Sequence, residues 1–242
     1  VGELTVEKKG EILDGFKGGF LASSYEKEFI YKEGSLAGAK FEVYAAEDIY
    51  TADNQKDADG NRIKYYSKGD LVTTLVTGED GKAVAKNLSL GQYRVVEVEA
   101  PYGYVLNPNE QKVTFTYVDD KTPVIKENLT FSNDRQKLAM SVTKLDVEDN
   151  TPIAGAVFGL YAGEDIKNAD GKVIIEKGTL LEKAVSDENG MIAFVKDYPF
   201  AKYVAKEIEK PAGYVTNNEV VKFDTEYQGQ KVKTAVYNSE YK

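Results

Sequence analysis

Residues of three complementary chemical types recur in the same order in each half of the chain: a lysine near the start, a glutamate further on and an asparagine at the end. The two sets are Lys8, Glu97 and Asn133, and Lys144, Glu207 and Asn238. A lysine amine is nucleophilic only when it is neutral, and burial favours the neutral form by lowering the lysine pKa. Burial also raises the pKa of a carboxyl group, which can then hydrogen-bond a carboxamide and polarise its carbonyl for attack.

The alternation of side chains along the expected strands groups these residues by face. In the opening strand, Leu4, Val6 and Lys8 share a face, whereas Lys9 falls on the polar one. The other three sets that share a face and end on a lysine or an asparagine are Met140, Val142 and Lys144; Leu129, Phe131 and Asn133; and Thr234, Val236 and Asn238. Alternation leaves the direction of Glu97 open, because residues on both faces of its strand are apolar.

The chain contains an internal repeat. The segment QYRVVEVEAPYGY at 92–104 has a second version, YVAKEIEKPAGY, at 203–214, and LAGAKFEVYAAEDI from Leu36 matches IAGAVFGLYAGEDI from Ile153. An Asp-Gly pair typical of tight hairpin turns follows in each half. The β-branched and aromatic content, with turns about every 8 to 12 residues, indicates β-sandwiches. We therefore predict an all-β protein with two domains, at 1–136 and 137–242.

The repeated pattern Y-x-x-x-E-x-x-x-P-x-G-Y resembles the E-box of Gram-positive pilins and of the Cna B-type (SpaA-like) domains of cell-wall adhesins. The resemblance implies two tandem Ig-like or prealbumin-like Greek-key β-sandwiches. It also implies an isopeptide bond within each half, Lys8 to Asn133 and Lys144 to Asn238, with Glu97 and Glu207 as proton shuttles. Such a bond forms once and needs no cofactor, so the resemblance implies no enzyme turnover.

The residue types alone also fit a simpler arrangement. A buried lysine and glutamate can pair as a salt bridge, with the asparagine satisfying backbone groups at the end of the sheet. A lysine at a strand end can also extend its ammonium to water. The sequence by itself leaves these alternatives open beside the covalent bond.

Composition excludes several classes of function. The 242 residues contain no cysteine, histidine or tryptophan, which removes disulfides, Ser-His and Cys-His nucleophile pairs and the commonest metal ligand. The net charge of -9, with both signs interleaved, argues against nucleic acid and anionic membranes as partners. Asp57, Asp59 and Asn61 suggest a calcium loop, but an EF-hand register would place Gln55 and Tyr66 where carboxylates are needed. We therefore expect no metal and no cofactor.

One segment of the first half, at about 10–35, has no counterpart in the second. Lys8 to Leu36 spans 28 positions and Lys144 to Ile153 only 9, a difference of 19 residues. The segment is rich in glycine and carries five aromatic residues, Phe16, Phe20, Tyr25, Phe29 and Tyr31. We expect a short helix around Leu21–Glu28. The segment is either a loop packed over the edge of the sandwich or a surface for a partner.

Three functions remain. The first is a structural stalk or pilin subunit, extracellular and anchored to the cell wall, joined to other subunits by a sortase outside this fragment. The second is an adhesin module that binds a host matrix protein or glycan through the 10–35 segment. The third is a glycosidase using Glu97 and Glu99, which would lie about 7 Å apart on one strand face. The chain lacks the Tyr-Pro-Lys and Leu-Pro-x-Thr-Gly motifs of shaft pilins, and no membrane insertion is expected.

Overall fold

The computed structural model describes the chain except for residues 19–22, 24–25, 52, 54 and 216. Its contacts divide the protein into two compact units. The first comprises Val1–Glu11, Glu33–Arg135 and Gly229–Lys231, and the second comprises Ile12–Lys32, Gln136–Gln228 and Val232–Lys242. Within the described residues there is no α-helix, and so none that is long and apolar enough to cross a membrane.

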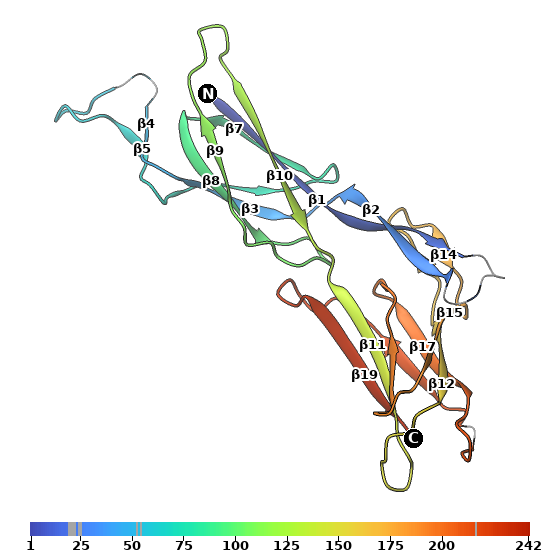
Figure 1. Cartoon of the computed structure of the whole chain (residues 1–242). Helices are drawn as coiled ribbons and strands as arrows, with labels where there is room; N and C mark the ends of the chain where they lie inside the picture. The colour runs from blue at the N-terminus through green and yellow to red at the C-terminus, as the bar shows by residue number, and fades with distance from the viewer. Residues whose placement is uncertain (19–22, 24–25, 52, 54, 216) are drawn as a thin grey trace. The chain divides into compact units, whose positions relative to one another are not determined.

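Two sheets build the first unit (Figure 1). One has the order β10-β1-β2, with β7 also paired to β1, and the other has the order β6-β3-β8-β9; β4 and β5 form a separate hairpin. The strands are β1 (Gly2–Lys17), β2 (Glu28–Ser35), β3 (Lys40–Ala45), β4 (Ile49–Tyr50), β5 (Lys64–Tyr66), β6 (Leu71–Val76), β7 (Lys82–Leu88), β8 (Gly91–Glu99), β9 (Gln111–Phe115) and β10 (Ile125–Asn133). The inward residues of both sheets make one continuous core, whereas residues 12–17 of β1 and 28–32 of β2 belong to the second unit.

The second unit repeats this plan. Its sheets have the orders β16-β11-β19 and β15-β12-β17-β18, and β13 and β14 form the hairpin. The strands are β11 (Lys137–Lys144), β12 (Val157–Ala162), β13 (Ile166–Lys167), β14 (Val173–Ile175), β15 (Leu180–Val185), β16 (Met191–Phe194), β17 (Lys202–Glu209), β18 (Val220–Asp224) and β19 (Thr234–Tyr241). The prediction of two all-β sandwiches is therefore confirmed.

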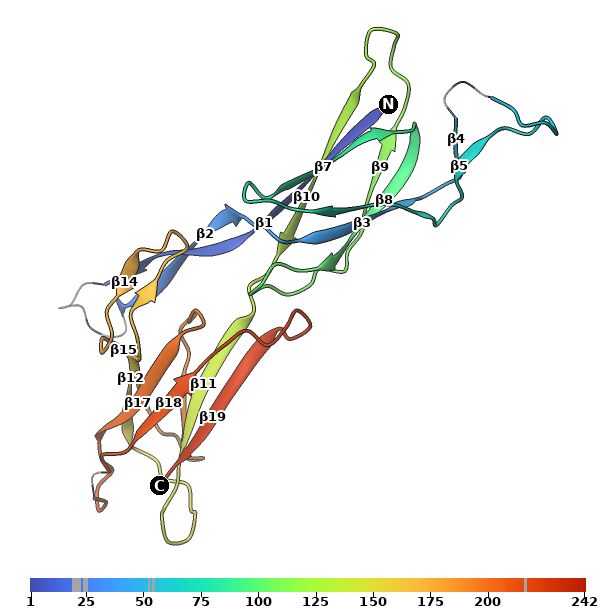
Figure 2. The ribbon, with the colours of Figure 1, turned by 180° about the vertical axis from the view of Figure 1, so that it is seen from behind.

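In each unit, the first and last strands pair in parallel. The β1 strand pairs with β10, and β11 pairs with β19, so the first and last strands of each unit are neighbours in one sheet. The β11 and β19 strands lie side by side when the protein is seen from either side (Figure 2). Parallel neighbours cannot be joined by a hairpin. The whole sandwich is therefore the connection between these two strands.

Local sequence explains the strands and turns. In β1, the residues from Gly2 to Gly10 alternate between buried and partly exposed positions, as expected for a strand with one face on a core. The expected Asp-Gly turns are present, with Gly60 and Gly171 both at φ +82°. This left-handed conformation is easily adopted by glycine because it has no Cβ.

The segment at about 10–35, which has no counterpart in the second half, is expected to belong to the first domain, but most of it packs in the second unit. Its residues 12–32 belong to the second unit, where Phe29 joins the buried core and Leu13, Phe16 and Tyr31 pack against it. The ring centroid of Phe29 lies 5.8 Å from that of Tyr198. The aromatic side chains are buried in this way because apolar surface is stabilised by removal from water. Of the expected helix at 21–28, residues 21–22 and 24–25 lie outside the described residues, as does Phe20, and Glu28 is the first residue of β2 rather than part of a helix.

Polar contacts fix the same segment. The ammonium of Lys27, a buried residue, donates to the Leu180 carbonyl at 3.0 Å. Between backbones, the Ala169 N–H donates to the Leu13 carbonyl at 2.9 Å. The Tyr31 hydroxyl donates to the Asp197 carbonyl at 3.1 Å. These contacts support packing, rather than partner binding, as the role of the described part of the segment.

We predict that Phe29→Ala destabilises the second unit. Loss of a buried phenylalanine removes its transfer free energy and leaves a cavity, and the expected cost is about 3–5 kcal/mol in the free energy of unfolding. Scanning calorimetry measures the loss as a lower unfolding temperature. The matched control is Ile30→Ala on the same strand, where the side chain is exposed and the expected change is about 0.5 kcal/mol or less. Equal effects of the two substitutions would contradict the packing role.

Candidate functional site

Lys8 lies on the inner face of β1 and is held there by its backbone. The Lys8 N–H donates to the Gly81 carbonyl at 2.7 Å, and its carbonyl accepts from the Leu36 N–H at 2.9 Å. Leu4 and Val6 precede it on the same face, and all three are fully buried. The β1 strand thus carries its lysine into the core, rather than to water at the strand end.

A glycine is required beside each of the two buried lysines. Gly81 has φ +75°, and a Cβ at this position would lie 2.9 Å from the Lys8 carbonyl oxygen. Gly190 also has φ +75°, and its Cβ would lie 2.4 Å from the Lys144 carbonyl oxygen. Both turns can approach the lysine-bearing strand only because no side chain intervenes.

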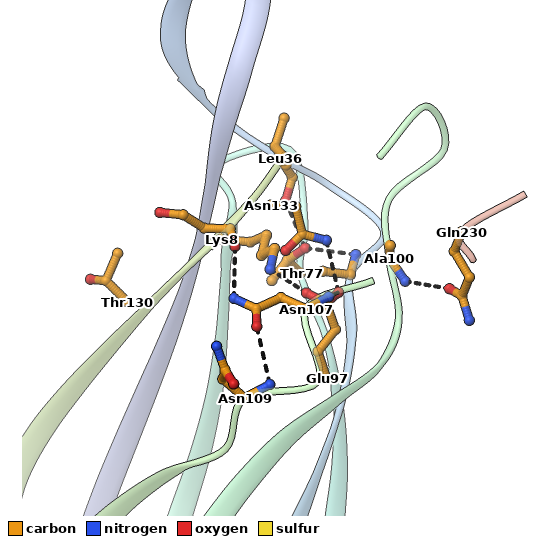
Figure 3. A network of polar contacts seen from close by, with 12 residues as sticks. Lys8, Leu36, Thr77, Glu97, Ala100, Asn107, Asn109, Thr130, Asn133 and Gln230 are labelled. Atoms are coloured by element: carbon orange, nitrogen blue, oxygen red, sulfur yellow. Dashed lines mark hydrogen bonds and ion pairs between the residues drawn. The ribbon is translucent and has the colours of Figure 1, made fainter. Parts of the chain in front are cut away.

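Lys8, Glu97 and Asn133 meet inside the first unit (Figure 3). Their exposed fractions are 0%, 2% and 4%. One oxygen of the Glu97 carboxyl group, Oε2, contacts the Lys8 Nζ, and the other, Oε1, accepts from the Asn133 Nδ2 at 2.7 Å. The glutamate therefore bridges the lysine amine and the asparagine carboxamide.

The register of β1 on β10 explains why the lysine and the asparagine are neighbours. Lys8 lies opposite Phe131, and Asn133 follows two positions later on the same face of the sheet. The β8 strand carries Glu97 from the facing sheet, where it pairs with Phe41 of β3. Three strands from two sheets are needed to assemble the cluster.

The surroundings of Lys8 are largely aromatic. Its Nζ lies 5.7 Å from the centroid of the Phe41 ring and 5.9 Å from that of the Phe131 ring. Burial lowers the pKa of Lys8, and the hydrogen bond and charge of Glu97 oppose that shift without reversing it. The neutral, nucleophilic form of the amine is thereby favoured relative to a lysine in water. The Asn133 Oδ1 is buried and accepts no hydrogen bond from a described residue.

The second unit brings together two of its three predicted residues. The Lys144 Nζ lies 3.5 Å from the Glu207 Oε2, and the two side chains are only 6% and 1% exposed. The Tyr241 ring lies beside the lysine, with 4.9 Å between the Nζ and the ring centroid. Lys144 lies opposite Tyr241 in the pairing of β11 with β19, as Lys8 lies opposite Phe131.

Asn238 does not join Lys144 and Glu207, and its predicted place in this site is corrected by the structure. Asn238 lies opposite Ser141, is exposed, and donates to the Ser141 hydroxyl at 2.7 Å and the Thr143 hydroxyl at 3.4 Å. Thr234, Val236 and Asn238 do share a face of β19, but it is the outer face. The buried residues Ala235 and Tyr241 belong to the alternate set.

Sequence reasoning overlooked Asn107 and Asn217. The Asn107 N–H donates to the Glu97 Oε1 at 3.3 Å, and its side-chain Nδ2 donates to the Ser132 carbonyl at 3.1 Å (Figure 3). The Asn217 Nδ2 likewise donates to the Lys242 carbonyl at 2.6 Å. Each asparagine follows its E-box glutamate by 10 positions. This equal spacing was the available signal.

The remaining candidates lie outside the buried cluster. Lys9 is paired at the surface with Glu7 and Glu33. Glu99 is exposed whereas Glu97 is buried beside Lys8, so the two do not form the carboxylate pair of a glycosidase.

The suggested calcium loop is a hydrogen-bonded turn, in which Asp57 accepts the Asp59 and Asn61 N–H groups. Among the described residues, no group of three or more acidic side chains could hold a metal ion.

Comparisons with known proteins agree with this architecture. A family model described as the SpaA prealbumin-like fold domain matches residues 26–129 and 139–240. The trypsin-resistant surface T6 protein of Streptococcus pyogenes serotype M6 is 25% identical over 142 residues, which are 57% of this chain and 26% of that protein. Among solved structures, the Bacillus anthracis TIE protein is 25% identical with a TM-score of 0.60, and the match covers 100% of this chain and 33% of that one.

The chain thus spans 26% of the T6 protein and 33% of the TIE chain. The two segments matched by the family model together cover more than half of the sequence, one in each half. This match confirms the family that the repeated E-box indicated. The chain belongs to the family of SpaA prealbumin-like fold domains, which it contains in two tandem copies.

Proposed function

We propose that this chain is a two-domain structural segment, a stalk or pilin subunit, of a protein on the surface of a Gram-positive cell. Its family membership and its likeness to the T6 surface protein support this proposal. An extracellular place on the cell wall, and covalent attachment to other subunits by a sortase, belong to the same proposal. We also propose 1–136 and 137–242 as the limits of the two repeats, with residues 12–32 of the first repeat packed in the second unit.

The chemistry of the segment is proposed to be one self-catalysed amide bond between Lys8 and Asn133. The observation that carries this proposal is the bridge made by Glu97, with one oxygen against the Lys8 Nζ and the other 2.7 Å from the Asn133 Nδ2. The first nitrogen is the nucleophile, and the second belongs to the leaving group. A carboxyl group in this position can move a proton from one to the other.

The reaction balances without a cofactor. The neutral Lys8 amine attacks the Asn133 carboxamide carbon, and a new C–N bond forms as the C–NH₂ bond breaks. Glu97 accepts a proton from the amine and delivers it to the departing nitrogen, which leaves as ammonia. Folding holds amine and carboxamide together, which supplies the high effective concentration that an unreactive amide requires. The site acts once per molecule and has no turnover.

A salt bridge alone accounts less well for the cluster. A buried ion pair must offset the loss of hydration of both charges, and burial already favours the uncharged Lys8. An ion pair also gives no role to Asn133, whose carboxamide lies against the same carboxyl group. An amide bond between Lys8 and Asn133, with Glu97 transferring the proton, gives a role to all three side chains.

We predict a mass deficit that depends on all three residues. Loss of one ammonia lowers the intact mass by about 17 Da relative to the sequence mass. Lys8→Ala, Asn133→Ala and Glu97→Gln should each abolish the deficit, the last because glutamine cannot shuttle the proton. The controls Lys9→Ala and Glu99→Gln, which alter residues on the same strands that lie outside the buried cluster, should retain it. If the folded protein has the full sequence mass, the amide bond has not formed and the cluster is an ordinary salt bridge.

The bond should also stabilise the first domain. The crosslink from Lys8 to Asn133 would close a loop of about 125 residues, which stabilises by roughly 5 kcal/mol in the chain-entropy model. We therefore expect Glu97→Gln to lower the unfolding temperature and speed digestion by trypsin, whereas Glu99→Gln leaves both unchanged. The measurements are scanning calorimetry and timed proteolysis. The proposed stabilisation fails if crosslinked and uncrosslinked proteins are digested at the same rate.

A further inference from the structure

A recess of about 650 Å³ opens in the first unit, where β5 meets the connections that follow β7 and β9. This volume is within the range of ligand pockets in proteins. Much of the lining is apolar or aromatic, and it includes Tyr65, Tyr66, Val72, Tyr93 and Tyr117. Tyr65 and Tyr117 are 58% and 64% exposed. Exposed aromatic rings grouped around a recess indicate a surface for a partner.

The internal repeat identifies the corresponding place in the second unit. The Tyr93 hydroxyl donates to the Ser89 carbonyl at 2.7 Å, four residues earlier. The Tyr203 hydroxyl donates in the same way to the Pro199 carbonyl at 2.5 Å. Together with the strand pairings, these bonds match Tyr66 with Ile175, Leu71 with Leu180, Val72 with Leu181, Leu88 with Tyr198, and Tyr93 with Tyr203.

The segment at 12–32 covers this place in the second unit. The ring of Phe29 packs on Tyr198, and Phe29 belongs to the same buried cluster as Ile175 and Leu181. Ile175 and Leu181 are only 5% and 0% exposed, whereas their counterparts in the first unit are partly exposed. The recess of the first unit is therefore the place that an aromatic segment fills in the second.

Polar contacts show what such a segment contributes besides its phenylalanine. The Lys27 ammonium donates to the Leu180 carbonyl, and the Tyr31 hydroxyl donates to the Asp197 carbonyl. Lys27, Phe29 and Tyr31 alternate with exposed residues, so they lie on one face of an extended segment. The occupant is thus defined by its pattern: a lysine, an aromatic residue two positions later and a hydroxyl two positions after that.

The charge of the recess suits the same pattern. Asp119 and Asp120 line it, and none of its described lining residues is a lysine or an arginine. The positive group among them, the Val1 ammonium, donates to the Pro123 carbonyl at 3.0 Å. Complementary charge guides a partner to such a surface and fixes its orientation. A segment that carries a lysine is favoured over an acidic one.

We propose that the recess of the first unit binds an extended segment of another polypeptide, with an aromatic residue two positions after a lysine. The aromatic side chain enters the recess against Leu88, the counterpart of Tyr198. The lysine lies at the Leu71 carbonyl, the counterpart of the Leu180 carbonyl that accepts from Lys27. The inference is independent of the proposed amide bond, because none of the lining residues belongs to the buried lysine cluster.

The test uses a synthetic peptide with the sequence of residues 26–34, EKEFIYKEG, labelled with a fluorophore and titrated with the whole chain. We expect fluorescence anisotropy to show saturable binding that Tyr65→Ala or Tyr117→Ala weakens about tenfold. The control Tyr102→Ala removes another exposed tyrosine of the first unit, one that does not line the recess, and should leave binding unchanged. Binding that none of these substitutions alters would overturn the inference.

Changes in the peptide test the proposed pattern. Phe29→Ala in the peptide should abolish saturable binding, whereas Ile30→Ala, on the opposite face, should change the affinity by about twofold or less. A benzophenone at the position of Phe29 should form crosslinks that map to the first unit. Crosslinks confined to the second unit would instead show exchange with its own segment at 12–32, and the proposal would be wrong.

Two other outcomes also decide against a peptide partner. The first is the absence of saturable binding at about 1 mM peptide, which is the affinity expected of a weak specific contact. The second is binding of an oligosaccharide on a glycan array that Tyr65→Ala abolishes, while the peptide does not bind. The recess is then a glycan site, and its likeness to the place filled by Phe29 has no bearing on its partner.

Discussion

The structure of each unit depends on a lysine amine held inside a β-sandwich. Desolvation of an isolated ammonium is so unfavourable that the group must become neutral, pair with a carboxylate or react. Two aromatic ring centroids lie 5.7 and 5.9 Å from the Lys8 Nζ, and the Glu97 carboxyl group contacts it. Burial lowers the pKa of this lysine. Gly81 has no side chain to block the close approach of its turn to this strand. The same requirement is met at Lys144 by Glu207, Tyr241 and Gly190.

Because the first and last strands of each unit pair in parallel, the buried amine lies where a bond to the last strand would close the domain. Because β1 lies beside β10, a bond from Lys8 to Asn133 would join two strands that nearly the whole domain separates in sequence. Tension applied at one terminus could then pass through the bond to the other without separating the strands. In a chain with no cysteine, such a bond would supply the covalent constraint that many secreted proteins obtain from disulfides.

The glycine- and aromatic-rich segment shows a different use of apolar residues. Phe16, Phe29 and Tyr31 belong to an insertion in the first repeat, yet they pack with the core of the second unit. A ligand-binding surface would keep such rings accessible, whereas Phe29 is buried against Tyr198. The described part of the insertion therefore contributes side chains to the core of the second unit.

The sequence by itself determined the repeat, the all-β class and five of the six residues predicted for the two buried clusters, because strand alternation and the E-box spacing are local properties. It also contained the equal spacing of 10 positions from each E-box glutamate to Asn107 and Asn217. Only the tertiary structure decided which face of each strand is buried, since Val236 and Asn238 alternate as regularly as Phe131 and Asn133. It likewise decided where residues 12–32 pack, because burial of aromatic rings depends on surfaces that are distant in the chain.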